Sequence, residues 1–283
     1  MATTALPQSS GSERVTPRWL PDTIVLLATV LLAVVAFFVL YPIALLLWNS
    51  FREGALGQQT GFGLANWTAA LTQPRILDAL WNTLTLAVAR QGLAVLAGVA
   101  IAWVLARTNV PGRNWIEMGF WFATLLPALP ILLGWILLLD SHYGLLIKAV
   151  QSVFPDFSFE IYSWWGIVVA HLLIGLIPVK VFLLTPAFRN MDAALEEAAR
   201  TSGASVPRTI FQIVLPLLFP TIAFVTLLGF VRSLQSFEIE LILGDQAGVR
   251  VYSTLIYRQV LARVPEYGQA TALSMLILGS MVP

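Results

Sequence analysis

The residues that could do chemistry in this chain are cationic side chains that interrupt long apolar stretches. They are Arg90, Lys180 and Arg232. An unpaired charge in hydrocarbon costs at least ~2.5 kcal/mol, so each of these side chains needs a partner or water. We expect structural pairing or snorkelling for Arg90 and Lys180 rather than contact with a solute, because Arg90 is isolated and Lys180 follows Pro178 near the end of its stretch.

A polar pattern surrounds Arg232. Ser236 and Glu240 follow it at intervals of four residues, so on one continuous helix the three side chains would share a face. Two interpretations stay open: this face lines a transport path, or Arg232 pairs with an acidic neighbour such as Glu238 or Asp140 to hold helices together. The candidate path residues are Arg232, Gln235, Ser236, Glu238 and Glu240.

Catalytic and metal-binding side chains are scarce. The chain contains no cysteine, and its two histidines, His142 and His171, lie far apart in the sequence. We interpret His171 as a hydrogen-bonded packing residue and place His142 in an exposed loop. Because no ligand spacing is recognisable, we expect no catalytic residue, no metal site and no cofactor, and an intramembrane enzyme is disfavoured. The phosphate-binding pattern G-x-x-x-x-G-K-[ST] is absent, so we do not expect this chain to hydrolyse ATP itself.

The composition places these residues in a membrane protein. Hydrophobic residues make up 58% of the chain and charged residues 11%, with a mean hydropathy of +0.81. A helix needs about 20 apolar residues to cross a bilayer. We therefore predict an all-α polytopic membrane protein, in which the polar residues 1–22 form a disordered tail. The predicted spans are 23–48, 79–106, 115–139, 164–186, 217–237 and 268–283.

Some of these stretches depart from a plain spanning helix. Pro127 and Pro130 predict a bent or broken third span, and 145–154 is typical of a short amphipathic helix at the membrane interface. The last stretch, 268–283, gives only about 24 Å of helix at 1.5 Å per residue, less than the hydrocarbon thickness. We expect the sequence to stop inside this helix.

A polar insert, LEEAARTSGASVPRTIFQIVLPLLFP at 195–220, separates the fourth and fifth apolar stretches. Asp192 can cap a helix at its N-terminus, and Gly203 can end it. Ser205 and Pro207 offer a second helix start, and we expect the next span to begin only after that second helix. The predicted product is a helix, a turn and a helix at one membrane face, able to transmit a push from a soluble partner into the adjacent spans.

The spacing of this insert resembles the EAA loop of ABC importer permeases, which grips the ATPase subunit. The resemblance rests on Glu197, Ala198, Ala199, Gly203, Ala204, Phe211, Ile213, Leu215, Pro216 and Pro220. It implies a type I importer-like transmembrane domain over 23–283, with a cytoplasmic coupling loop at 187–216. The coupling residues that it implies are Glu196, Glu197, Ala198, Ala199, Gly203 and Ala204. Ser202 stands where the family pattern often has Asp, so no role for that carboxylate is carried over.

Further segments resemble the iron(III) subgroup of the binding-protein-dependent permeases. They are NTLTLAVA from Asn82, AWVLARTNVPGR from Ala102 and SFEIELILGDQAGVRVYSTLIY from Ser236. The resemblance implies ferric iron as the first candidate cargo, followed by polyamine or phosphonate, although Glu240 stands where relatives more often have Pro. The implied partners are ABC ATPase subunits, a periplasmic binding protein, membrane lipid and a second permease unit, as a homodimer, a heterodimer or a fused half. No nucleic acid is implied.

An alternative from another class is an ion-coupled secondary transporter. That class typically carries two inverted halves with broken helices, and we find no such internal symmetry in the sequence. The EAA resemblance and the positive-inside rule together predict a bacterial inner-membrane protein with several spans and a cytoplasmic N-terminus. The arginines that this arrangement puts inside are Arg14, Arg18, Arg107, Arg113, Arg189, Arg200 and Arg208.

Overall fold

The computed structural model describes residues 22–54 and 61–281, and most of these residues are helical. The predicted tail lies outside the described residues, apart from Asp22. Two units are described separately, residues 1–48 and 49–283. Helix α1 (Asp22–Ser50) supplies the described part of the first unit with all but its last two residues, and Ile24–Ser50 is long and apolar enough to cross a membrane. Its residues are predominantly apolar, as expected of a membrane-spanning helix.

The second unit begins with a small antiparallel hairpin and a short helix. Strand β1 (Arg52–Glu53) pairs with β2 (Gly61–Phe62), and α2 (Ala65–Thr72) follows. The Glu53 carboxylate accepts a hydrogen bond from the backbone N–H of Ala65 (3.0 Å), which satisfies one free amide at the start of α2. The hairpin and the short helix lie between the first two predicted spans.

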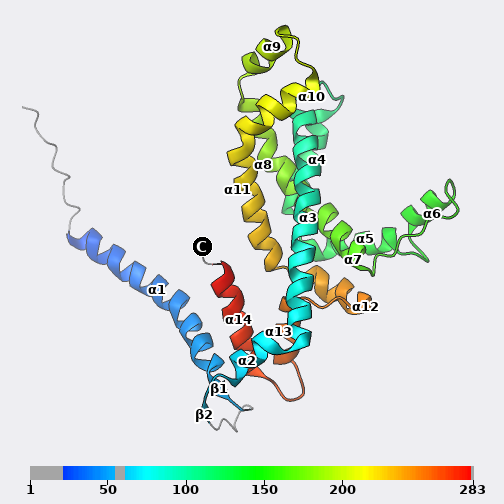
Figure 1. Cartoon of the computed structure of the whole chain (residues 1–283). Coiled ribbons are helices and arrows are strands. Elements are labelled where there is room, and N and C mark those ends of the chain that lie inside the picture. Colours follow the sequence, from blue (N-terminus) through cyan, green and yellow to red (C-terminus); the bar gives the residue numbers. More distant parts are fainter. Residues whose placement is uncertain (1–21, 55–60, 282–283) are drawn as a thin grey trace, which may run out of the picture. The chain divides into compact units, whose positions relative to one another are not determined.

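Long apolar helices form the bundle of the second unit (Figure 1). The first is α3 (Pro74–Arg107), and a second continuous span comprises α7 (Trp164–His171), a π-helical turn η1 (Leu172–Leu176) and α8 (Ile177–Asn190). A third comprises α10 (Val206–Thr209), the π-helical turn η2 (Ile210–Val214) and α11 (Leu215–Leu234). Helix α3 packs against both α8 and α11. The apolar core between these helices includes Ala102, Leu184, Phe188, Val214 and Leu218.

The predicted third span is broken rather than straight. Helix α4 (Arg113–Leu125) and helix α5 (Ala128–Leu139) meet at an angle of 114°. Leu126 is extended because it precedes Pro127, and Pro127 in turn occupies the position just before the first turn of α5. Helix α4 lies along α8, whereas α5 leads away from the bundle to α6 (Figure 1). The short helix predicted at 145–154 is α6 (Leu145–Gln151).

The C-terminal part is a series of short helices. A π-helical turn η3 (Glu240–Gly244) runs into α12 (Asp245–Ala247), and α13 (Tyr252–Val260) precedes α14 (Tyr267–Met281). Helix α14 packs against α13 and α2. Within the described residues four helices meet the length and hydropathy of a membrane span, or five if the bent α4–α5 pair counts as one. The all-α polytopic fold is therefore confirmed, while a sixth span at 268–283 stays a prediction.

The approach of α3 to α8 yields a stability prediction. A Cβ atom on Gly98 would lie 2.6 Å from Cβ of Lys180, whereas one on Gly92 in the same helix would meet nothing within 4 Å. We expect Gly98→Ala to cost about 1–3 kcal/mol by overpacking, and Gly92→Ala to be neutral or stabilising through its higher helix propensity. Thermal unfolding in detergent measures both variants. Equal melting temperatures for the two would contradict the close contact.

Candidate coupling helix and transport path

The first half of the polar insert forms an isolated helix, α9 (Ala193–Thr201). Asp192 caps it, with its carboxylate accepting a hydrogen bond from the N–H of Ala194 (2.9 Å). At the other end Gly203 has φ +84°, a left-handed conformation that glycine adopts without strain. The N–H of Ala204 donates to the carbonyl of Ala199 (3.0 Å), and the N–H of Gly203 donates to that of Arg200 (3.0 Å). These bonds make a Schellman motif, so the predicted cap and stop are both confirmed.

The second half of the insert differs from the prediction. Ser205 does precede a helix start and Pro207 lies in its first turn, but α10 continues without a break into η2 and α11. The fifth span therefore begins at Val206 rather than at 217. A helix would ordinarily break near Pro216, because proline lacks an N–H and clashes with the preceding turn. The wider π-helical turn of η2 comes directly before this proline and lets the helix pass through it.

An ion pair ties α9 to the end of α3. Arg107 Nε lies 3.0 Å from Glu196 Oε1, and Arg107 Nη2 donates a hydrogen bond to the carbonyl of Met191 (2.7 Å). Both charged side chains are largely buried, at 14% and 21% exposure. Glu197 and Ala198, by contrast, are exposed. Of the other predicted coupling residues, Gly203 is also exposed, while Ala199 and Ala204 are half-buried.

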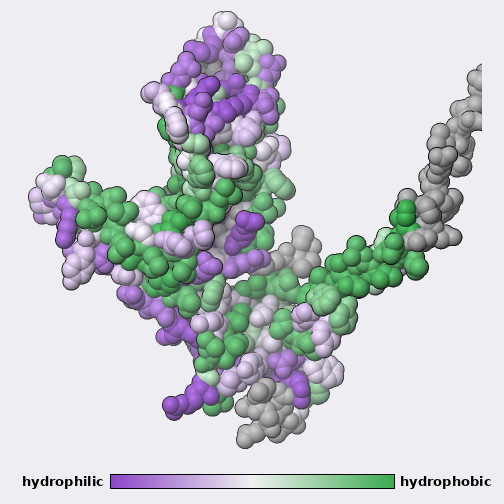
Figure 2. Space-filling model, turned by 180° about the vertical axis from the view of Figure 1, so that it is seen from behind, coloured by the Kyte–Doolittle hydropathy of each residue, from purple (hydrophilic) through white to green (hydrophobic). Residues whose placement is uncertain are grey.

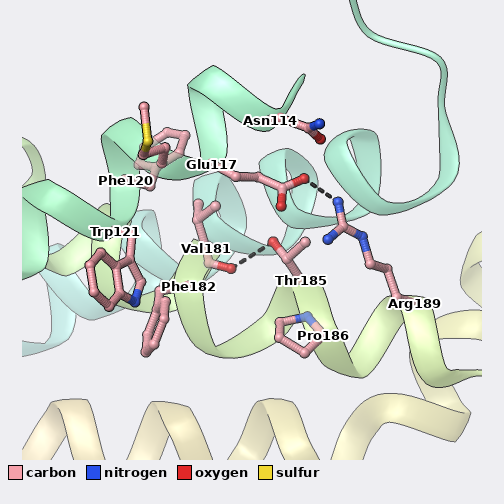
Figure 3. Close-up of a pocket in the computed structure, with 10 residues that line it drawn as sticks. Asn114, Glu117, Phe120, Trp121, Val181, Phe182, Thr185, Pro186 and Arg189 are labelled. Atoms are coloured by element: carbon pink, nitrogen blue, oxygen red, sulfur yellow. Dashed lines mark hydrogen bonds and ion pairs between the residues drawn. The ribbon is translucent and has the colours of Figure 1, made fainter. Parts of the chain in front are cut away.

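The same end of the bundle carries further polar contacts. Arg189 at the end of α8 forms an ion pair with Glu117 of α4, beside a pocket of about 390 Å³ between these helices (Figure 3). On the next turn the hydroxyl of Thr185 donates to the carbonyl of Val181 (2.7 Å). Figure 2 shows hydrophilic residues gathered over the end formed by α9 and α10, above a mostly apolar surface. The arginines at the ends of helices and in the loops here are Arg107, Arg113, Arg189, Arg200 and Arg208.

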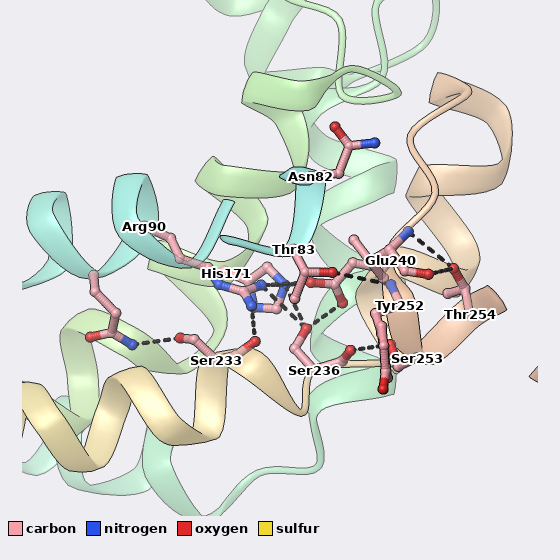
Figure 4. Close-up of polar contacts among 12 residues, drawn as sticks. Asn82, Thr83, Arg90, His171, Ser233, Ser236, Glu240, Tyr252, Ser253 and Thr254 are labelled. Atoms are coloured by element: carbon pink, nitrogen blue, oxygen red, sulfur yellow. Dashed lines mark hydrogen bonds and ion pairs between the residues drawn. The ribbon is translucent and has the colours of Figure 1, made fainter. Parts of the chain in front are cut away.

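A buried ionic cluster lies deep in the bundle, where α3, α7 and η3 meet (Figure 4). Arg90 Nη1 lies 2.6 Å from Glu240 Oε1 and 2.6 Å from His171 Nε2. His171 Nε2 in turn lies 2.9 Å from the same carboxylate oxygen. The hydroxyl of Ser236 donates to Glu240, and the second guanidinium nitrogen of Arg90 donates to the carbonyl of Ser233. The side chains of Arg90 and Glu240 are 2% and 1% exposed, so neither charge is solvated by water.

A second polar group joins α3, α8 and α11. Lys180 Nζ donates to Gln91 Oε1 (2.7 Å). The amide nitrogen of Gln91 donates to the carbonyl of Gly229 (2.7 Å) and to the hydroxyl of Ser233 (2.6 Å). Lys180 and Gln91 are both buried. Lys180 is therefore held by a neutral partner, unlike Arg90.

The predicted polar face at Arg232 is not one helix face. Helix α11 ends at Leu234, and Glu240 lies in the separate turn η3. Glu240 points into the bundle and is neutralised by Arg90, a pairing across the fold that the sequence analysis missed. Neither acidic neighbour proposed for Arg232 pairs with it within the described residues. Asp140 instead accepts hydrogen bonds from the backbone N–H groups of Tyr143 (2.9 Å) and His142 (2.8 Å), which lower the pKa of this carboxyl group.

A pocket of about 590 Å³ collects the other predicted path residues. It lies between the η1–α8 segment and the C-terminal end of α11, and every predicted path residue except Glu240 lines it. The polar residues of its lining are His171, Lys180, Arg232, Gln235, Ser236 and Glu238. His171 is hydrogen-bonded, as predicted, but it also joins the pocket to the ionic cluster. Among the described residues, no group of three or more His, Asp or Glu side chains is arranged to hold a metal ion.

The ionic cluster gives a second prediction. Removing one member leaves the other charge buried, so we expect Glu240→Gln to destabilise the protein by about 3–5 kcal/mol. The double variant Arg90→Met with Glu240→Met removes both charges and should recover much of that loss. Thermal unfolding of Arg90→Met, Glu240→Met and their double variant makes a double-mutant cycle. The exposed Glu238→Gln is the matched control for Glu240→Gln. Additive losses in Arg90→Met and Glu240→Met would refute the coupling.

Comparison with known proteins identifies the family. Residues 94–282 match the family described as "Binding-protein-dependent transport system inner membrane component". The molybdenum transport system permease protein ModB of Escherichia coli K12 is 33% identical over 168 residues, covering 57% of this chain and 71% of that protein. The putative ferric transport system permease protein FbpB 1 of Haemophilus influenzae is 28% identical over 260 residues, covering 89% of this chain and 39% of that protein.

Further likenesses agree with that match. A probable sulfate transport system permease protein cysT of Marchantia polymorpha is 28% identical over 264 residues, covering 88% of this chain and 80% of that protein. The fold resembles a chain in the crystal structure of a bacterial alginate ABC transporter in complex with an alginate pentasaccharide-bound periplasmic protein. The TM-score is 0.74 at 19% identity, over 92% of this chain and 91% of that chain. This chain belongs to the binding-protein-dependent inner-membrane permeases of ABC importers, and not to the alternative class of ion-coupled secondary transporters.

Proposed function

We propose that this permease subunit couples ATP hydrolysis on separate ATPase subunits to the import of a small solute, which a periplasmic binding protein delivers. The observation that carries the proposal is helix α9. It stands apart at one end of the bundle with Glu197 and Ala198 exposed, and both of its ends are fixed by hydrogen bonds. A short helix whose ends are fixed can move as a rigid body without unwinding.

The connections of α9 support its role as the ATPase contact. It directly follows α8 and precedes α10 in the chain, and Arg107 ties it to α3. A displacement of α9 therefore acts on the three helices that pack together around the buried polar groups. Glu196 serves as the internal anchor in this proposal, while Glu197 and Ala198 make the outer contact.

The sidedness that we propose puts α9 in the cytoplasm of a bacterium. The arginines gathered at that end agree with the positive-inside rule, which gives most weight to short loops such as the one between α3 and α4. The N-terminus is then also cytoplasmic, because α1 is the single candidate span before α3 among the described residues. A second permease unit would complete the transport path, as the family implies.

For the cargo we place a small oxyanion ahead of the ferric ion favoured by the sequence resemblance. Lys180 and Arg232 line the pocket together with a single carboxylate, that of Glu238. Sulfate is an oxyanion, and molybdenum in neutral water forms the oxyanion molybdate, so the relatives named for these solutes agree with a cationic lining. Phosphonate fits for the same reason, whereas a polyamine would be repelled. Ferric iron is the second candidate, because the relative named for ferric transport matches 89% of this chain.

The coupling role predicts that charge on the outer face of α9 disrupts assembly. We expect Ala198→Arg together with Glu197→Arg to lower copurification of the ATPase subunit by about tenfold, because an interface loses affinity when a desolvated cation has no partner. Ala149→Arg, at an exposed alanine of α6, is the matched control and should copurify normally. Retained ATPase binding in the α9 variant would count against the proposal. So would labelling of an Ala198→Cys variant by a thiol reagent added from the periplasmic side.

The anchor at Arg107 predicts a different defect. We expect Arg107→Glu to keep the ATPase subunit bound but to reduce transport per ATP hydrolysed by about fivefold, because α9 then moves without α3. The ion pair of Arg107 with Glu196 is partly buried, so its loss costs more than the loss of an exposed pair. The swap Arg107→Glu with Glu196→Arg should restore part of the coupling. Arg113→Glu, at the same end of the bundle, serves as the control. Transport and hydrolysis measured together in proteoliposomes decide the question.

A further inference from the structure

Lys180 is a buried cation without a carboxylate partner. It is 2% exposed, and the hydrogen bond of its ammonium group is to the neutral Gln91 at 2.7 Å. An ammonium group has three N–H donors, so this bond leaves capacity for further acceptors. Within the described ranges no acidic side chain lies in ion-pair distance of Lys180. A charge in such a place is costly unless another group compensates it.

Gln91 is neutral, so its amide oxygen cannot compensate the charge of Lys180 fully. Its amide nitrogen donates to the carbonyl of Gly229 and to the hydroxyl of Ser233, and these two acceptors fix the direction of the amide. Its oxygen is thereby aimed at Lys180. The lysine is held in one position by a dipole rather than neutralised by an anion.

Arg232 adds a second cation to the same pocket. It lies one turn beyond Gly229 on α11, lines the pocket with Lys180, and is exposed. In the part of the chain that the structure describes, it has no ion pair. The nearby buried carboxylate, Glu240, is occupied by Arg90 and His171 and does not line the pocket. The pocket therefore has an excess of positive charge, since Glu238 is its one acidic residue.

We propose that Lys180 and Arg232 form a binding site for a small oxyanion on the transport path, in which Gln91 positions Lys180. The site rests on the proposed function and names the residues that select its cargo. Charge-assisted hydrogen bonds from an ammonium and a guanidinium group to anionic oxygens are among the strongest in proteins. They strengthen in a pocket of low dielectric, and the same field repels cations. An entering oxyanion would compensate the lysine charge that the protein leaves unpaired.

The test uses the complete importer in proteoliposomes, with the ATPase subunits, the second permease unit and the binding protein. The probes are radiolabelled molybdate, radiolabelled sulfate and ferric iron, each supplied alone. We expect Arg232→Gln and Lys180→Met to lower uptake of the transported oxyanion by about tenfold, because each removes a charge-assisted contact. Arg232→Lys keeps the charge and should retain most of the uptake. Equal loss in Arg232→Lys and Arg232→Gln would overturn the electrostatic role.

Gln91→Glu provides an isosteric test of the role of Gln91. A carboxylate at this position would neutralise Lys180, but it replaces the NH2 group that donates to Gly229 and Ser233 with an acceptor oxygen. We expect the concentration of oxyanion that half-saturates uptake to rise by about tenfold, because the protein itself then supplies the counter-ion of Lys180. An unchanged half-saturation concentration would overturn this part of the proposal.

Matched controls separate the site from general effects of charge. Lys148→Gln on α6 and Arg263→Gln in the loop before α14 remove exposed cations outside the pocket, and we expect wild-type uptake from both. Uptake of either oxyanion at wild-type rates by Arg232→Gln and Lys180→Met would overturn the site and leave the importer function intact. ATP-driven uptake of ferric iron alone, unaffected by these changes, would do the same. An importer that fails with every probe and does not hold an ATPase subunit would instead refute the proposed function itself.

Discussion

The structure depends on the high cost of leaving a charge unpaired inside an apolar bundle. Arg90 lies in the middle of α3, far from water, and it is neutralised by Glu240, which lies 150 positions further along the chain. His171 from the α7–η1 junction contacts the same carboxylate oxygen. Because these partners come from different helices, satisfying one buried charge fixes the mutual positions of α3, α7 and η3. The same requirement explains why Glu240 points inward although its neighbour Glu238 is exposed.

Irregular helix geometry makes these meetings possible. The π-helical turns η1 and η2 come just before Pro178 and Pro216, so both long helices continue through a proline. The break after α11 lets η3 turn back into the bundle, and the start of α13 is held there by further polar contacts. Thr83 of α3 accepts a hydrogen bond from the N–H of Tyr252 (3.1 Å), and Ser253 donates to the carbonyl of Ser236 (2.5 Å). Neutral hydrogen bonds thus support the ionic cluster.

Helix α3 connects α9 to the polar groups beside the pocket. Its last residue, Arg107, holds Met191 and Glu196 at the end of the bundle, and the middle of the same helix carries Arg90 and Gln91. The two regions are about 24 Å apart along a helix that rises 1.5 Å per residue. A continuous helix of this length is stiff, so in the proposed mechanism a movement at the α9 end would reach the polar groups around the pocket. The proposed coupling and the proposed anion site therefore share one mechanical element.

The sequence alone determined the features that depend on local chemistry. The apolar stretches predict the membrane helices, Asp192 and Gly203 predict both ends of α9, and Pro127 predicts the break between α4 and α5, because caps and breaks act within a few residues. Tertiary structure decided which charges meet. The pairings of Arg90 with Glu240 and of Arg107 with Glu196, and the neutral partner of Lys180, join residues from different helices. No local pattern encodes such pairings, since they depend on how the helices pack.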